Sequence, residues 1–204
     1  MNVMEGVLNR AKNIHNIDDL RSISKSPVID LDDISSIKDR FLTLHNVVVE
    51  GFDNKELLAV KSTLAGYDDM LTEFPEIQRT LHIIRYVGNI ASMGDWCTSG
   101  LSRVGKSGLQ DYGTGVHEAA HALDYARSIE KGIGYSELIV ETARKNLGFR
   151  INGADYIRIR MELTADLADA RDPREVFAYA LESHKGGCGN DFAKEIYKLL
   201  KKEV

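Results

Sequence analysis

Residues 117–121 of the chain form a HExxH sequence, which combines residue types that bind zinc and activate water. On an α-helix, residues four apart project from one face, so His117 and His121 can share one ion. Glu118 does not reach that ion from the adjacent position, but its carboxylate can deprotonate a water at the open coordination position. The motif therefore predicts a zinc site with Glu118 as the general base.

The residues around the motif favour a helix from Gly113 to about Glu130. Apolar residues recur there at helical spacing, at Val116, Ala119, Ala120, Leu123, Ala126 and Ile129. Asp124 follows His121 by three residues on the same face, and we expect its carboxylate to orient a ligand imidazole. The alternative interpretation is a buried or surface histidine pair that binds no metal.

A catalytic zinc usually has a third protein ligand, which must come from elsewhere in the chain. The candidate carboxylates are Glu137, Glu141, Glu162, Asp166 and Glu175. Glu141 has a spacing from His121 close to that of thermolysin-like enzymes. Glu175 opens an apolar helix that can cross the HExxH helix, but Asp172, Pro173 and Glu175 also fit a capping arrangement in which Glu175 only closes the helix start. The residues alone leave this choice open.

A second motif, GxxxxGK[ST], spans Gly100 to Ser107. A phosphate-binding loop follows a buried strand and opens a helix whose amides hold the phosphates. Here the motif is preceded by MGDWCTS and followed by GLQDYGTG. The four glycines between residues 105 and 115 disfavour a helix after the motif. We therefore reject nucleotide binding.

Length and composition predict one globular domain of 204 residues with 43% hydrophobic content. The net charge of −5 does not indicate a nucleic-acid or anionic-membrane surface. No apolar stretch is long enough to span a bilayer, and the N-terminus does not resemble a signal peptide. The two cysteines, Cys97 and Cys188, do not form a disulfide framework, so we expect a cytoplasmic protein with two free thiols. His184 and Cys188 alone do not close a second metal site.

The first part of the chain, up to about residue 74, reads as helices joined by polar turns. Asp33 is expected to cap a helix that includes Ile34, Ile37, Phe41, Leu44 and Val48, and Asp53 one that includes Leu57, Leu58, Val60 and Leu64. We recognise no catalytic or ligand-binding motif in this segment.

The rest of the chain predicts a small sheet and several helices. The strand signals are residues 81–87 and, beside them, 96–104. After the HExxH helix we expect a glycine-marked turn, a helix capped by Ser136 and ended at Gly148, and helices that start near Asp172 and Asn190. Residues 157–161 are ambiguous between strand and helix.

The segments GVHEAAHALDYA and DPREVFAYALE resemble zincins of the lethal-factor type, above all the zincin-like modules of phage head proteins and related toxins. Those proteins show HExGHALD or a similar sequence, then a helix of the form xEFFAEAF whose first Glu completes the zinc site. The resemblance implies His117, His121 and Glu175 as the zinc ligands and Glu118 as the base. It covers roughly Tyr67 to Lys202, since FPEIQRTLHII and NDFAKEIYKLLKK also match the phage modules.

The chain departs from that family pattern at two positions. Tyr179 stands where the family often has a second Glu, four residues after the ligand, and a Tyr there can still hydrogen-bond an imidazole. Ala168 replaces a Tyr that many members use as donor to the developing oxyanion, and Tyr156 or Tyr179 would have to substitute for it.

Together these features predict a single α+β domain, mainly helical and zincin-like, with a small twisted β-sheet packed on the HExxH helix. Residues 1–74 form its helical lead-in and residues 75–204 the metallopeptidase core. The expected function is zinc-dependent hydrolysis of peptide bonds, with a peptide or protein substrate held along an edge strand near Trp96. The alternative is a structural or assembly module of a phage or mobile element, which would bind partner proteins of that origin and cut no bond.

Overall fold

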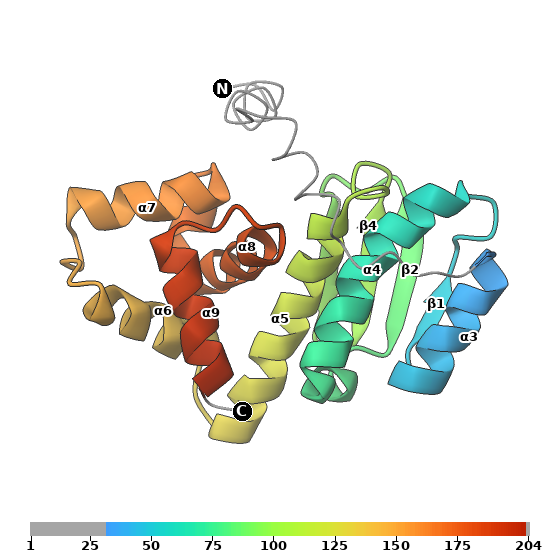
Figure 1. Cartoon of the computed structure of the whole chain (residues 1–204), viewed down its shortest axis with the longest axis horizontal. Coiled ribbons are helices and arrows are strands. Elements are labelled where there is room, and N and C mark those ends of the chain that lie inside the picture. Colours follow the sequence, from blue (N-terminus) through green and yellow to red (C-terminus); the bar gives the residue numbers. More distant parts are fainter. Residues whose placement is uncertain (1–31, 203–204) are drawn as a thin grey trace.

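Helix α5 (Tyr112–Lys131), which carries the HExxH sequence, runs through the middle of an α+β fold in the computed structural model (Figure 1). The structure describes residues 32–202. The other elements are α3 (Ile34–His45), β1 (Val48–Glu50), α4 (Leu57–Glu73), β2 (Ile83–Gly88), β3 (Gly94–Cys97), β4 (Leu101–Gly105), α6 (Tyr135–Asn146), α7 (Ala154–Thr164), α8 (Pro173–Lys185) and α9 (Asp191–Lys202), with 3₁₀ turns η1 (Pro75–Arg79) and η2 (Asp169–Arg171). Helix α5 contacts α4 and β3 on one side and α8 on the other.

The four strands form a mixed sheet in the order β1-β2-β4-β3. Strands β1, β2 and β4 are parallel, while β3 pairs antiparallel with β4 and lies at the sheet edge. Val49, Ile84 and Ser102 lie in register and are buried, so this row faces the helices. The adjacent row is charged, and its pairs Glu50–Arg85 and Asp95–Arg103 form salt bridges on the other face. The alternation is that of a sheet covered on one side.

The sequence determines both ends of α5. Asp111 is its N-cap and accepts hydrogen bonds from the backbone N–H groups of Gly113 (3.2 Å) and Thr114 (2.9 Å). The helix ends at Gly132, whose φ of 67° is left-handed. The predicted range, Gly113 to about Glu130, therefore agrees closely with the structure.

Helices α4 and α5 cross with their backbones nearly in contact. A Cβ atom on Gly115 would lie 2.3 Å from the Thr63 carbonyl oxygen, and one on Gly66 would lie 2.3 Å from the Tyr112 carbonyl oxygen. Only glycine fits at these two positions. Tyr67 continues the contact to the sheet, since its hydroxyl lies 2.7 Å from Ser102 Oγ.

Two expectations for the first part of the chain are wrong. Asp33 caps α3 as predicted, but Val48 is not helical, because Asn46 adopts a left-handed φ of 54° and ends the helix before Val48 pairs with Ile83. Asp53 does not cap α4, which begins after Glu56; its carboxylate pairs with Lys38 instead. The predicted lead-in thus contributes a strand to the sheet, and its residues 1–31 lie outside the described range.

Later elements follow the predictions with local differences. Residues 96–104 supply parts of two strands, because a turn at residues 98–100 separates β3 from β4. Ser136 does not cap α6; it lies inside the helix, and Gly134 precedes the first turn. The ambiguous residues 157–161 are helical within α7. Helices α8 and α9 start next to Asp172 and Asn190, as predicted.

Within residues 32–202, no helix combines the length and apolar character needed to cross a membrane.

Candidate metal centre

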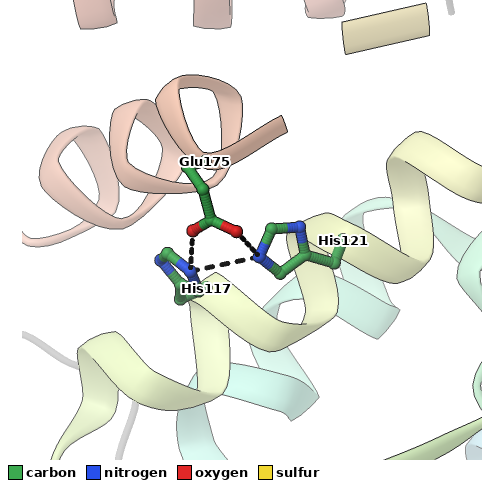
Figure 2. Close-up of side chains that lie close together, drawn as sticks. All are labelled: His117, His121 and Glu175. Carbon is green, nitrogen blue, oxygen red and sulfur yellow. Dashed lines mark hydrogen bonds and ion pairs between the residues drawn. The ribbon is translucent and has the colours of Figure 1, made fainter. Parts of the chain in front are cut away.

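Three side chains from two helices converge at the HExxH motif (Figure 2). His117 and His121 project from α5, and their Nε2 atoms are 3.1 Å apart. Glu175, from the first turn of α8, places one carboxylate oxygen 3.3 Å from His117 Nε2 and the other 3.5 Å from His121 Nε2. Among the described residues, no other group of His, Cys, Asp or Glu side chains meets the geometric requirement for holding a metal ion.

The spacing of these three groups fits a tetrahedral zinc. With bonds of about 2.0–2.1 Å, neighbouring ligand atoms around such an ion are about 3.3 Å apart. The separations of 3.1, 3.3 and 3.5 Å bracket that value, although the carboxylate offers a different oxygen to each ring. Two imidazoles and one carboxylate are also a donor set typical of catalytic zinc, which keeps its fourth position open.

Glu175 is not used to cap α8. The Asp172 side chain accepts from Arg174 N at 2.9 Å, and the Asp172 N–H donates to the Asp169 carbonyl, so Glu175 does not close a capping box there. Its carboxylate instead faces the histidines, as the family resemblance implies. Glu141 lies on α6 and pairs with Arg144 and Lys145.

Glu118 is buried next to this centre. Its side chain lines an open cleft beside the three ligands, only 4% of the residue is exposed, and Oε2 has no hydrogen-bond partner within residues 32–202. Burial raises the pKa of Glu118 to about 7. A Cβ on Gly94 of β3 would lie 2.9 Å from Glu118 Oε1, so the glycine leaves the room that this carboxylate occupies. A carboxylate in this state can accept and return a proton near neutral pH.

Ion pairs and hydrogen bonds connect the residues of this centre. Burial alone would lower the pKa of His117, but hydrogen bonds with Glu175 and Glu182 raise it to about 10. Hydrogen bonds from His117 and His121 likewise lower the pKa of Glu175. A metal ion would therefore replace a proton at this position.

An open cleft of about 1050 Å³ gives access to the centre. Its walls come from β3, α5, α8 and η2, and residues 93–98, on and next to β3, line one side. Trp96 lies in this wall, and its ring centroid is 5.4 Å from that of Tyr125. The Trp96 indole N–H donates to the Thr80 carbonyl at 3.1 Å. The edge strand near Trp96 thus borders the cleft.

Two residues of the site were missed by the sequence analysis. Glu182 lies on α8, two turns after Glu175, and its Oε2 is 3.2 Å from His117 Nδ1. Tyr125 lies on α5 one turn after His121 and lines the cleft. Glu182 follows Glu175 by seven residues and Tyr125 follows His121 by four, so each lies on the same helix face as a predicted ligand. This helical spacing is the sequence signal that could have identified both residues.

The expected role of Asp124 is wrong. The Asp124 carboxylate accepts from the Ser136 backbone N–H at 2.6 Å and from Ser128 Oγ at 3.4 Å, so it ties α5 to the start of α6. Glu182, which lies on α8, contacts the His117 imidazole instead.

The two candidate substitutes for the missing tyrosine have different positions. The Tyr179 and His117 rings pack edge to face with centroids 4.5 Å apart, and the Tyr179 hydroxyl donates to Asp169 Oδ2 at 3.5 Å. Tyr156 is buried against Phe149 and Phe192 and does not line the cleft. Of these two tyrosines, only Tyr179 therefore lies at the site.

The remaining sequence signals lie outside the centre. Leu101–Gly105 of the GxxxxGK[ST] motif forms β4 and is followed by turns, so the motif is not a strand-to-helix phosphate loop. His184 stacks on Tyr197, with ring centroids 3.9 Å apart. Cys97 and Cys188 are exposed free thiols.

Comparison of the chain with protein-family models, curated proteins and solved structures found no match.

Proposed function

We propose that the chain is a zinc-dependent metallopeptidase of the zincin type. The observation that carries the proposal is the buried Glu118 carboxylate, which lies beside a three-ligand group with the spacing that zinc requires. Its Oε2 has no hydrogen-bond partner among residues 32–202. A purely structural metal site has no use for such a base. The resemblance of HEAAHALD and REVFAYALE to the zincins supports the same conclusion.

Each residue has a definite task in this reaction. His117, His121 and Glu175 would hold the ion, which when bound supplies a Lewis acid that acidifies water and polarises a peptide carbonyl. Glu118 removes a proton from the water as its oxygen bonds to the carbonyl carbon. Glu118 then delivers that proton to the amide nitrogen as the C–N bond breaks, which leaves a carboxylic acid and an amine.

Strand β3 is suited to orient the substrate. Within residues 32–202 it pairs with β4 along one edge only, and its residues line the cleft that leads to the three ligands. An extended peptide can add to such an edge through backbone hydrogen bonds. The scissile carbonyl would then be presented between the edge strand and α5.

The second candidate function is a zincin-shaped assembly module that cuts no bond and binds proteins of a phage or mobile element. The observation in its favour is Ala168, which removes the hydroxyl that many zincins place before the ligand helix. Both functions predict the same metal ligands, so only catalysis separates them.

The test compares the native chain with Glu118→Gln for zinc content and for cleavage of a peptide library. Glu130→Gln is the matched control, because Glu130 is exposed at the far end of the same helix and pairs with Arg79. We expect stoichiometric zinc in all three proteins and cleavage by all except Glu118→Gln. A native chain without zinc would overturn the proposal, whereas zinc without cleavage would favour the assembly module.

A further inference from the structure

His117 has a carboxylate at each of its two ring nitrogens. Glu175 lies 3.3 Å from Nε2, on the side of the metal centre, and Glu182 lies 3.2 Å from Nδ1. Both carboxylates come from α8, two turns apart, so one helix contacts the imidazole at both nitrogens. His121 differs, because Asp124, the nearby acid on its own helix, accepts hydrogen bonds from Ser136 and Ser128 instead.

The contact with Glu182 determines which nitrogen of His117 can bind a metal. A neutral imidazole carries one N–H and one lone pair. When Nδ1–H donates to the Glu182 carboxylate, the lone pair is on Nε2, which points toward Glu175 and His121. The same hydrogen bond limits rotation of the ring and makes Nε2 more basic.

Gly113 provides the space for Glu182. A Cβ atom at Gly113 would lie 2.8 Å from Glu182 Oε1 and 3.1 Å from its Cγ. Gly113 is in the first turn of α5 and has no left-handed φ, so its own backbone does not require glycine. The missing Cβ at Gly113 therefore leaves the room that the Glu182 side chain occupies.

We propose that Glu182 is a positioning residue which fixes the orientation and tautomer of His117, and that Gly113 is required for it to reach the ring. The inference rests on the metal binding in the proposed function, but not on peptide cleavage. Hydrogen-bond partners of metal-bound histidines typically contribute a factor of about 10–100 to metal affinity. We expect a loss of that size when the contact is removed.

The experiment measures zinc affinity by competition with a chromogenic chelator. Glu182→Ala and Gly113→Ala should each weaken zinc binding by about 10–100-fold, and Glu182→Gln, which keeps a neutral acceptor, should weaken it less. Glu130→Gln and Gly134→Ala are the matched controls. A Cβ at Gly134 would make only ordinary contact, 3.6 Å from Glu137 Oε2, so neither control should change the affinity.

A double-mutant cycle separates positioning from general damage to the fold. Glu182→Ala should have no further effect in a His117→Ala background, and should keep its full effect in a His121→Ala background. Circular dichroism of the metal-free variants checks that each one folds.

Three outcomes would overturn the role of Glu182. The first is unchanged zinc affinity in Glu182→Ala, and the second is an equal loss in the His117→Ala background. The third, a native chain that binds no zinc, would overturn the proposed function as well, and the first two leave that function standing.

Discussion

The two sides of α5 are packed according to different rules. Toward α4, Gly115 and Gly66 bring the two backbones into contact, with no side chain between them at the crossing. Toward α8, the contact includes polar side chains, among them His117, Glu175 and Glu182, which lie around an open cleft beside the buried apolar residues. The first side therefore provides stability, whereas the second keeps charged groups in the positions that a metal ion needs.

The largest effect is expected from breaking the rigid side. A Cβ on Gly115 would meet the Thr63 carbonyl oxygen at 2.3 Å, and backbone cannot move aside as a side chain can. We expect Gly115→Ala to lower the free energy of unfolding by about 3 kcal/mol, measured by urea denaturation. Gly113→Ala on the same helix meets only the side chain of Glu182 and should change stability by less than about 1 kcal/mol. Equal losses would contradict the distinction between the two sides.

The next largest effect is expected from removing the ligand that α8 supplies. Glu175→Ala should weaken zinc binding by at least about 100-fold, because an ion held by two imidazoles alone has lost its only anionic ligand. Glu141→Ala should bind zinc like the native chain, since Glu141 pairs with Arg144 on α6. The chelator competition assay measures both. The reverse result would transfer the ligand role to Glu141.

Glu118→Gln should stabilise the metal-free chain. Burial raises the pKa of Glu118 to about 7 in the folded state, so folding becomes less favourable as the pH rises from 4.5, the ordinary value, through 7. Above that window the neutral amide should add about 3 kcal/mol to the free energy of unfolding. Urea denaturation at low and at neutral pH measures the difference, which should vanish in acid. A destabilised variant at neutral pH would show that the carboxylate has a stabilising partner.

The smallest effect is a change of about 1.4 kcal/mol per pH unit in zinc binding. Zinc must displace the proton of His117, whose pKa is about 10 in the metal-free chain, so affinity should rise roughly tenfold per unit from about pH 7 to about pH 9. The free energy of unfolding of the metal-free chain should instead decrease as the pH rises. The ion pairs of protonated His117 contribute fully below its ordinary pKa of 6.5 and are lost as the pH rises through 10. Calorimetric titration in buffers of different ionisation enthalpy counts the released proton, and no release would contradict the ion-paired state.

Short-range signals in the sequence predict much of the fold. Asp33 and Asp172 cap helices because an N-cap needs only the backbone two or three residues ahead, and the apolar spacing of α5 gives its range. Val48 was placed incorrectly because its strand depends on Ile83, a partner that local periodicity does not contain. A turn that follows α3 can be read locally only if the left-handed Asn46 is recognised.

The metal centre shows the same difference between local signals and contacts with distant segments. The pair His117 and His121 follows from spacing on one helix, and Glu175 required a family resemblance because it lies on another. Glu182 shares a helix face with Glu175, but its choice of His117 depends on how α8 crosses α5. Asp124 was assigned to the wrong partner because a competing donor, Ser136, reaches it from the next helix.

The division of the ligands between α5 and α8 also has a consequence for synthesis of the chain. A growing polypeptide exposes both histidines and Glu118 well before Glu175 and Glu182 have been made. The three-ligand group exists only after α8 has docked on α5, so a centre built on it would be assembled last. With the peptidase function proposed above, an unfinished chain would lack hydrolytic activity while its own segments are still unfolded and most exposed to cleavage.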